Sequence, residues 1–244
     1  KTGRVFSAAD VLHMYAPPPV QYTNKMGIEV EMPIVKIIGD AVSLPTSGEM
    51  QLLKTTLENK GYDAQLEPAG VIEYASPPTS VDQIAPFVQK VKGDLCAFFN
   101  AVSAAGYKKI DFSIVPTTHP EEALKNIVAR DRLQMSLQAM KSMFGPNVMR
   151  LPLLTASTQA SFSPQDEGAL FKMTYRSYAL MPLLMAACNS CSGYVANDPD
   201  KVDYLPRGRY YQEYGAGAGI SESFLKSSNG KEFINNHIDE VFNA

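Results

Sequence analysis

Two short segments of the chain each carry a pair of acidic residues whose types and spacing suit metal binding. In the first segment, apolar side chains alternate with Glu29 and Glu31. In an extended strand this alternation places both carboxylates on one face, roughly 6–7 Å apart. The second segment carries Glu67 and Glu73. Mg²⁺ prefers oxygen ligands, often carboxylates shared with a phosphorylated substrate. The four acids therefore predict a magnesium–nucleotide site, although a strand with one solvated face gives the same alternation.

A third segment, residues 151–163, predicts a strand with a stripe of short polar side chains. The stripe consists of Thr155, Ser157, Gln159, Ser161 and Ser163. A solvated strand usually carries Lys and Glu, and this stripe has neither. It therefore suits a wall beside a bound polar ligand, and a solvent-facing strand is the alternative.

Two arginines near the C-terminal end have the chemistry of anion ligands. Arg207 and Arg209 lie beside Tyr210 and Tyr211. Guanidinium groups can hold phosphate or carboxylate oxygens with two hydrogen bonds, although an ordinary basic loop has the same composition. The cysteines are weaker evidence for a functional site. Cys188 and Cys191 have zinc or redox spacing, but no second pair or nearby His completes a site.

The composition narrows the function classes. The chain has 244 residues, of which 45% are hydrophobic and 19% charged, so it can bury a sizeable core. The net charge of −3, with scattered Lys and Arg, argues against a nucleic-acid or anionic-membrane surface. No apolar run is long enough to span a membrane. The three cysteines indicate a reducing compartment, so we expect a cytoplasmic protein.

The elements that must position these residues alternate between strands and helices. Strands are predicted at 26–38, 71–76, 110–115 and 151–163, and helices near 48–60, 84–102, 165–190 and 233–241. Ser80 and Gln83 form a capping-box pattern before the second helix, but Pro86 lies inside it, so we expect a kink or a later start. The acid- and hydroxyl-bearing strands have two unlike faces, which favours an antiparallel or mixed sheet.

Taken together, these segments resemble the glutamate–cysteine ligase family, particularly its plant and proteobacterial branch, and the related carboxylate–amine ligases. The resemblance runs from about residue 25 to the C-terminus. The segments that carry it are 27–31, 66–78, 155–161, 176–190 and Arg207. The most specific of them reads Leu-Glu-Pro-x-Gly-x-x-Glu.

The resemblance implies a glutamine-synthetase-like fold of the α+β class. In this fold a curved, largely antiparallel sheet forms an open funnel with helices packed on its outer face. Residues 1–25 would be a lead-in segment and residues 26–244 the catalytic domain. Chains of the family are longer, so the C-terminal part of the fold is expected to be absent. Three explanations stay open: the part lies outside this sequence, another chain supplies it, or the fold is reduced.

The resemblance also implies an activity and roles for the site residues. ATP would phosphorylate a side-chain carboxylate, typically the γ-carboxylate of glutamate, and an amine would displace the phosphate to form an amide. The implied metal ligands, for Mg²⁺ or Mn²⁺, are Glu29, Glu31, Glu67, Glu73 and Gln159. The implied substrate-binding residues are Thr155, Ser157, Ser161 and Arg132. Arg207 would be catalytic, and Arg207 and Arg209 would bind the nucleotide.

Two other function classes stay open. A ligase-like subunit could have kept the sheet and serve in binding or assembly without catalysis. A metal-dependent hydrolase could use the same acids, but no His lies near them in the sequence to act as general base. The expected partners are a small amino acid and an amine. Whether the chain forms a homo-oligomer or needs a second chain to complete the fold is left open.

Overall fold

The computed structural model describes a chain of the α+β class that divides into two compact units. The described residues are 19–67, 70–109, 138, 141–142, 156–187, 194–195, 198–202 and 220–243. The first unit contains, among these, residues 27–67, 70–109 and 156–161; the second contains 19–26, 162–187 and 220–243. The predicted boundary between a lead-in and a catalytic domain at residue 25 stays a prediction.

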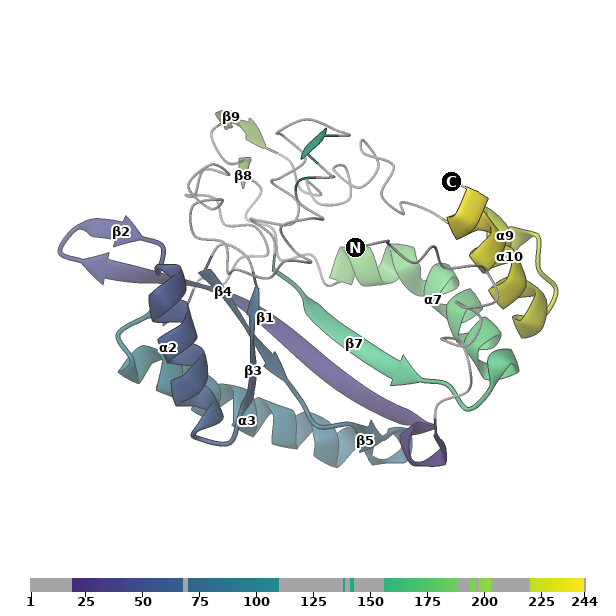
Figure 1. Cartoon of the computed structure of the whole chain (residues 1–244), viewed down its shortest axis with the longest axis horizontal. Helices are drawn as coiled ribbons and strands as arrows, with labels where there is room; N and C mark the ends of the chain where they lie inside the picture. Colours follow the sequence, from purple (N-terminus) through teal and green to yellow (C-terminus); the bar gives the residue numbers. More distant parts are fainter. Residues whose placement is uncertain are drawn as a thin grey trace, which may run out of the picture. The chain divides into compact units, whose positions relative to one another are not determined.

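The sheet is built around one long strand (Figure 1). Its strands within the described residues are β1 (Lys25–Ile38), β2 (Ala41–Ser43), β3 (Asp63–Glu67), β4 (Val71–Ala75), β5 (Thr79–Ser80), β6 (Lys108–Lys109) and β7 (Thr158–Ser163). The order is β2-β1-β4-β3, and β5, β6 and β7 also pair with β1. β1 pairs antiparallel with β2, β4 and β6, and β3 pairs antiparallel with β4. The sheet is curled and antiparallel, which is one of the two arrangements, antiparallel or mixed, that the two-faced strands predict.

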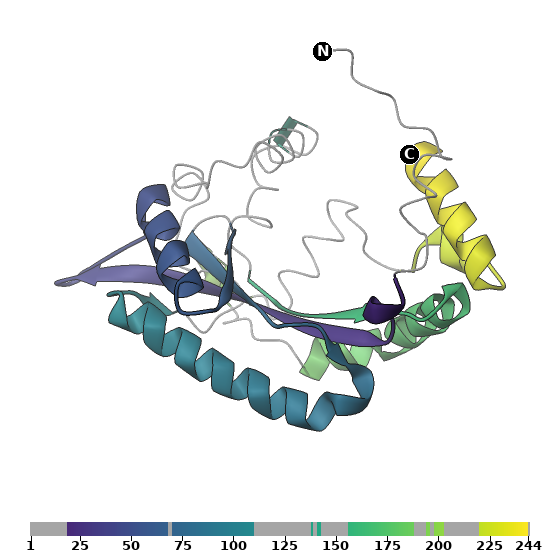
Figure 2. The same cartoon turned by 60° about the horizontal axis from the view of Figure 1, so that its bottom comes forward.

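Two helices cover the apolar face of the β3–β4 part of the sheet (Figure 2). They are α2 (Ser47–Glu58) and α3 (Ile84–Ala104). The side chains that they bury against the sheet recur at helical spacing: Met50, Leu53, Leu57, Phe87, Val91, Phe98, Ala101 and Val102. From the sheet, Ala64, Leu66, Ile72 and Tyr74 complete this core. The opposite face of the same strands therefore carries the polar residues.

The start of α3 corrects one sequence prediction and confirms another. Ser80 makes no capping hydrogen bond, so the predicted capping box is absent. Residues Val81–Gln83 form a 3₁₀ turn instead, and α3 begins at Ile84, later than a cap at Ser80 would place it. Pro86 then falls in the first turn of the helix. Backbone N–H groups there have no partner within the helix, so a proline costs no hydrogen bond.

The start of α2 carries a capping box that the sequence analysis did not identify. The Glu49 N–H donates to the Thr46 hydroxyl, and the Glu49 carboxylate accepts from the Thr46 N–H. Lys36 of β1 also donates to this carboxylate at 2.9 Å. The Lys36 ammonium, together with the Thr46 donors, lowers the pKa of Glu49 to about 2. This cluster links the first turn of α2 to the sheet.

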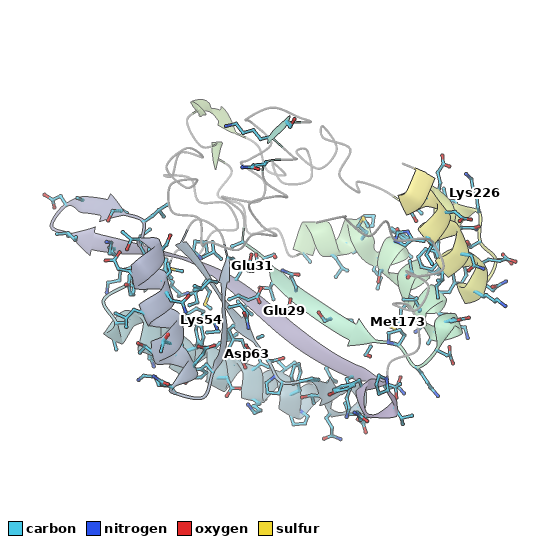
Figure 3. The ribbon with its side chains drawn as sticks, in the orientation of Figure 1. Glu29, Glu31, Lys54, Asp63, Met173 and Lys226 are labelled. Carbon is cyan, nitrogen blue, oxygen red and sulfur yellow. The ribbon has the colours of Figure 1, made fainter. Side chains whose placement is uncertain are left out.

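The second unit is helical and is held by aromatic packing. Its main helices among the described residues are α7 (Glu167–Ala187), α9 (Glu222–Leu225) and α10 (Gly230–Asn243). Phe224 contacts Phe171, Phe233 and Tyr178, with ring centroids 5.0, 5.7 and 5.1 Å away. Lys226, labelled in Figure 3, pairs with Glu222 on the surface.

The remaining predicted elements can be compared where the structure describes them. The predicted strands at 26–38 and 71–76 and the predicted helices near 48–60 and 165–190 are confirmed, with ends shifted by at most three residues. The predicted strand at 110–115 lies outside the described residues. A short hairpin of β8 (Tyr194–Val195) and β9 (Asp198–Val202) is present as well. No helix within the described part of the chain is sufficiently long and apolar to span a membrane.

Candidate functional site

The segment with the most specific resemblance folds as a β-hairpin. β3 and β4 pair antiparallel through residues 63–67 and 71–75, and Gly70 lies in the connection. Gly70 has φ +75°, a conformation that side chains disfavour, and a Cβ there would lie 3.0 Å from Pro45 and 3.3 Å from the Ile34 carbonyl oxygen. Only glycine fits both restrictions. The hairpin fixes the register that places Glu67 and Glu73 on one face.

The register of two ladders makes Glu73 the centre of an acidic face. In the β1–β4 ladder Glu31 lies directly opposite Glu73, and in the β3–β4 ladder Gln65 lies directly opposite it. Directly paired residues share a face. Glu29 and Glu67 occupy the diagonal positions, where cross-strand neighbours are about 7–8 Å apart. The four predicted acids therefore lie on the same face, opposite the face that α2 and α3 cover.

Glu31 and Glu73 form the closer of the two kinds of antiparallel pair. The Ser76 N–H donates to the Ile28 carbonyl oxygen, so residues 28, 30 and 32 direct their backbone groups toward β4. Glu31 directs its own N–H toward β7. Residue 31 is therefore a non-hydrogen-bonded position toward β4, where opposed Cα atoms are only about 4.5 Å apart. Like charges at such a pair are destabilising and favour a compensating cation or hydrogen-bond donor.

Ser157, which directly precedes β7, and Gln159 of β7 supply hydrogen-bond donors to Glu31. The Ser157 N–H and hydroxyl donate to Oε2 of Glu31 at 2.7 and 3.0 Å. Gln159 Nε2 donates to Oε1 at 2.9 Å. The Glu31 N–H donates in turn to the Ser157 carbonyl oxygen at 2.9 Å. The polar stripe of β7 thus faces the acids, and by alternation Ser161 lies on the same side as Gln159.

The other acids differ in their surroundings. Glu29 lies on β1 beside Glu31 (Figure 3), and among the described residues no side chain donates a hydrogen bond to its carboxylate. Glu67 and Glu73 each take part in a further interaction, so neither residue is without a partner. All four acids are partly exposed. Solvent and a small ligand can therefore reach this face.

The backbone beneath Glu73 is held from the helical side. Tyr74, the next residue of β4, packs edge-on against Phe98 of α3 with ring centroids 5.6 Å apart. Its hydroxyl donates to Asp94 at 3.0 Å. Burial, together with the Asp94 carboxylate, raises the pKa of Tyr74, whereas the hydrogen bond from Lys90 lowers the pKa of Asp94. These contacts join β4 to α3 and so tie the backbone beside Glu73 to the core.

The donor set fits a magnesium ion only if other oxygen ligands complete the coordination. In the described part of the chain, no three Asp, Glu, His or Cys side chains approach closely enough to hold a metal by themselves. Mg²⁺ usually binds one or two carboxylates and fills its remaining positions with water and substrate phosphates. Glu29 and Glu73, hard oxygen donors at diagonal positions, match that requirement.

Several predicted site residues cannot be placed. Thr155, Arg132, Arg207 and Arg209 lie outside the described residues, so their predicted roles stay predictions. Two further polar residues share the acidic face and were not identified in the sequence: Asp63 and Gln65 of β3, which are joined by a 2.8 Å hydrogen bond. Residues 63–67 alternate polar and apolar side chains, and this pattern could have identified β3.

Comparisons with known proteins leave the family open. No protein-family model matches the chain, and no curated protein matches it at a significant level. The arguments for a function therefore come from the sequence and from the geometry of the acidic face.

Proposed function

We propose that this chain is an ATP- and Mg²⁺-dependent carboxylate–amine ligase with its site on the acidic face of the sheet. The observation that carries the proposal is the register that surrounds Glu73 with Glu31, Glu29 and Glu67 on one partly exposed face. Concentrated negative charge of this kind is costly without a cation to offset it. The family resemblance of the hairpin and of β7 supports the ligase class and a glutamine-synthetase-like fold.

The chemistry explains why such a face would be useful. A carboxylate is a poor electrophile, so a terminal phosphoryl group is first transferred from ATP to a carboxylate oxygen, which releases ADP. An amine nitrogen then attacks the acyl carbon and phosphate leaves, which gives the amide. Bound Mg²⁺ would offset the negative charge that the phosphates and the carboxylate bring together.

In this proposal the acids and the neutral polar residues have different roles, and they lie on different strands. Glu29 and Glu73 would hold the cation, with Glu67 at its edge. Ser157, Gln159 and Ser161 line the neighbouring strand with neutral donors and acceptors, which suit a substrate carboxylate or amine. Arg207 and Arg209 stay the predicted phosphate ligands. Glutamate is the expected carboxylate donor, and the amine is open.

The direct test measures ADP release with glutamate or aspartate and a panel of amines. We expect release that requires Mg²⁺ and rises with one donor–amine pair. Glu73→Ala and Glu29→Ala should each lower the rate by about 100-fold or more, because each removes a cation ligand. Glu58→Gln is the matched control, because it removes an exposed charge on α2 and should keep the rate.

Two results would contradict the proposal. Normal turnover in both alanine variants would refute the assignment of the site, provided that both variants keep the wild-type circular dichroism spectrum and cooperative unfolding. Absence of ADP release by the wild type with every donor–amine pair would count against the ligase.

One observation favours a second candidate, a non-catalytic ligase-like subunit. The Glu31 carboxylate accepts three hydrogen bonds from Ser157 and Gln159, and no three metal-ligating side chains converge in the described part of the chain. A subunit of this kind would keep the sheet and bind no Mg–ATP. Calorimetric titration with Mg–ATP separates the two candidates, because only the ligase should show metal-dependent nucleotide binding.

A further inference from the structure

The contact between Glu31 and β7 has a geometry that a metal ligand does not need. Three hydrogen bonds converge on the Glu31 carboxylate, one from a backbone N–H, one from a hydroxyl and one from an amide. Hydrogen bonds to a charged acceptor are about twice as strong as neutral ones. Two of the three come from Ser157, the residue to which Glu31 also donates its N–H. We call Glu31, Ser157 and Gln159 the Glu31 cluster.

Next to the Glu31 cluster, the edge of β1 that faces β7 lacks a backbone donor. Glu31 directs its N–H toward β7, so the next donor on that edge would be residue 33. Residue 33 is a proline, which has no N–H. The Ser157 N–H would face the Glu31 carbonyl oxygen in a regular ladder, but it donates to the side-chain carboxylate. The Glu31 carboxylate therefore takes the place of the Glu31 carbonyl oxygen as the acceptor of the Ser157 N–H.

Apart from the backbone pairing of β7 with β1, little apolar burial holds this strand in place. Thr158 to Phe162 are exposed along the strand, and Phe162 is 48% exposed. Burial of apolar surface therefore contributes little to the position of these residues, and hydrogen bonds must contribute more. Ala156 is the buried residue beside Ser157.

We propose that Glu31 is a positioning residue that fastens β7 to β1 and so aligns the polar stripe of β7 with the cation-binding acids. The catalytic purpose of this contact rests on the proposed function. The attachment of β7 to β1 by Glu31 needs no bound ligand. It reassigns Glu31, Ser157 and Gln159 from direct metal and substrate contact to the support of Glu29, Glu73 and Ser161.

Substitution by glutamine distinguishes a positioning role from a metal-binding role. In Glu31→Gln the amide oxygen can still accept both bonds from Ser157, and the new NH₂ group can donate to Gln159 once the Gln159 amide turns over. The cluster is kept and the charge is lost. Glu31→Ala removes both. A positioning role therefore predicts rescue by glutamine, whereas a metal ligand loses its function in either variant.

The first measurement is amide hydrogen exchange at residues 157–163 without ligand. We expect Glu31→Ala to speed exchange there by about 10- to 100-fold, because it breaks charge-assisted bonds, and Glu31→Gln to stay within about threefold of the wild type. Glu29→Ala, which removes the neighbouring acid, should leave these rates unchanged. Equal rates in Glu31→Ala and the wild type would overturn the proposal.

The second measurement is kcat/KM for ADP release. Glu31→Ala should lower it, and Glu31→Gln should recover most of the loss. Loss in Glu31→Gln equal to that in Glu31→Ala, with normal exchange in β7, would overturn the proposal by showing that the charge is needed. If the wild type releases no ADP, the ligase function fails, and the exchange rates still decide whether Glu31 fastens β7.

Discussion

At the scale of single residues, the arrangement of charge follows from strand register. Glu73 is the central acid because it lies opposite Glu31 in one ladder and opposite Gln65 in the other. A shift of one residue in either ladder would turn these side chains into the core. The sequence predicts that Glu29 and Glu31 share a face, because they alternate with apolar residues. It does not predict that Glu31 would be engaged by Ser157 and Gln159, because they lie more than 120 residues away.

Glu49 gives a pH-dependent prediction at the residue scale. Its pKa of about 2 in the folded protein lies below the ordinary value of 4.5, chiefly because Lys36 donates to it. The group therefore stabilises the fold fully above about pH 4.5, and this contribution is lost as the pH falls toward 2. The pair is partly exposed, so we expect ~1 kcal/mol or less.

Urea unfolding of the wild type and Glu49→Gln measures this contribution directly. The wild type should be the more stable at pH 7, and the difference between the two should shrink steadily between pH 4.5 and pH 2. Other carboxyl groups titrate in both proteins and cancel. A difference that stays constant over this range would mean that the Lys36–Glu49–Thr46 contacts do not set the pKa of Glu49.

At the scale of elements, the sequence predicts the helices and strands with strong hydrophobic periodicity and does not predict the short ones. The long strand β1 and the helices α2, α3 and α7 follow from their apolar spacing. β3 was missed because its five residues follow a helix directly after the Gly61 turn, and short alternation is a weak signal. The Ser80 capping box fails because a 3₁₀ turn separates Ser80 from the start of α3.

Packing of α3 on the sheet gives a prediction at the element scale. Phe98 is fully buried and contacts both Tyr62 and Tyr74, at 5.3 and 5.6 Å between ring centroids. Phe98→Ala should lower the free energy of unfolding by about 3–5 kcal/mol, because it removes apolar burial and leaves a cavity. The measurement is denaturant unfolding.

The control for this substitution lies on the same helix. Ile84 is 53% exposed, so Ile84→Ala should change the stability by about 0.5 kcal/mol or less. A similar loss in both variants would contradict the assigned packing face of α3. A loss near zero in Phe98→Ala would show that α3 contributes little to the core beneath Glu73.

At the scale of the whole molecule, the sequence predicts the fold class more completely than it predicts the site. Two-faced strands separated by amphipathic helices predict an antiparallel or mixed sheet with helices, and the structure has an α+β architecture with an antiparallel sheet. The division into two compact units could not be predicted, because residues 19–26, 162–187 and 220–243 join one unit across long stretches of sequence. The roles of Arg132 and Arg207 in binding a ligand stay sequence predictions, since neither residue falls within the described part of the chain.

The central claim is that the acidic face around Glu73 binds a cation together with a nucleotide. The most direct measurement is calorimetric titration of Mg–ATP into the wild type and into Glu73→Ala, each repeated with ATP and chelator in place of Mg²⁺. The account predicts saturable binding to the wild type that requires Mg²⁺ and is lost in Glu73→Ala. Equal binding by both proteins, or no Mg²⁺-dependent binding by the wild type, would contradict it.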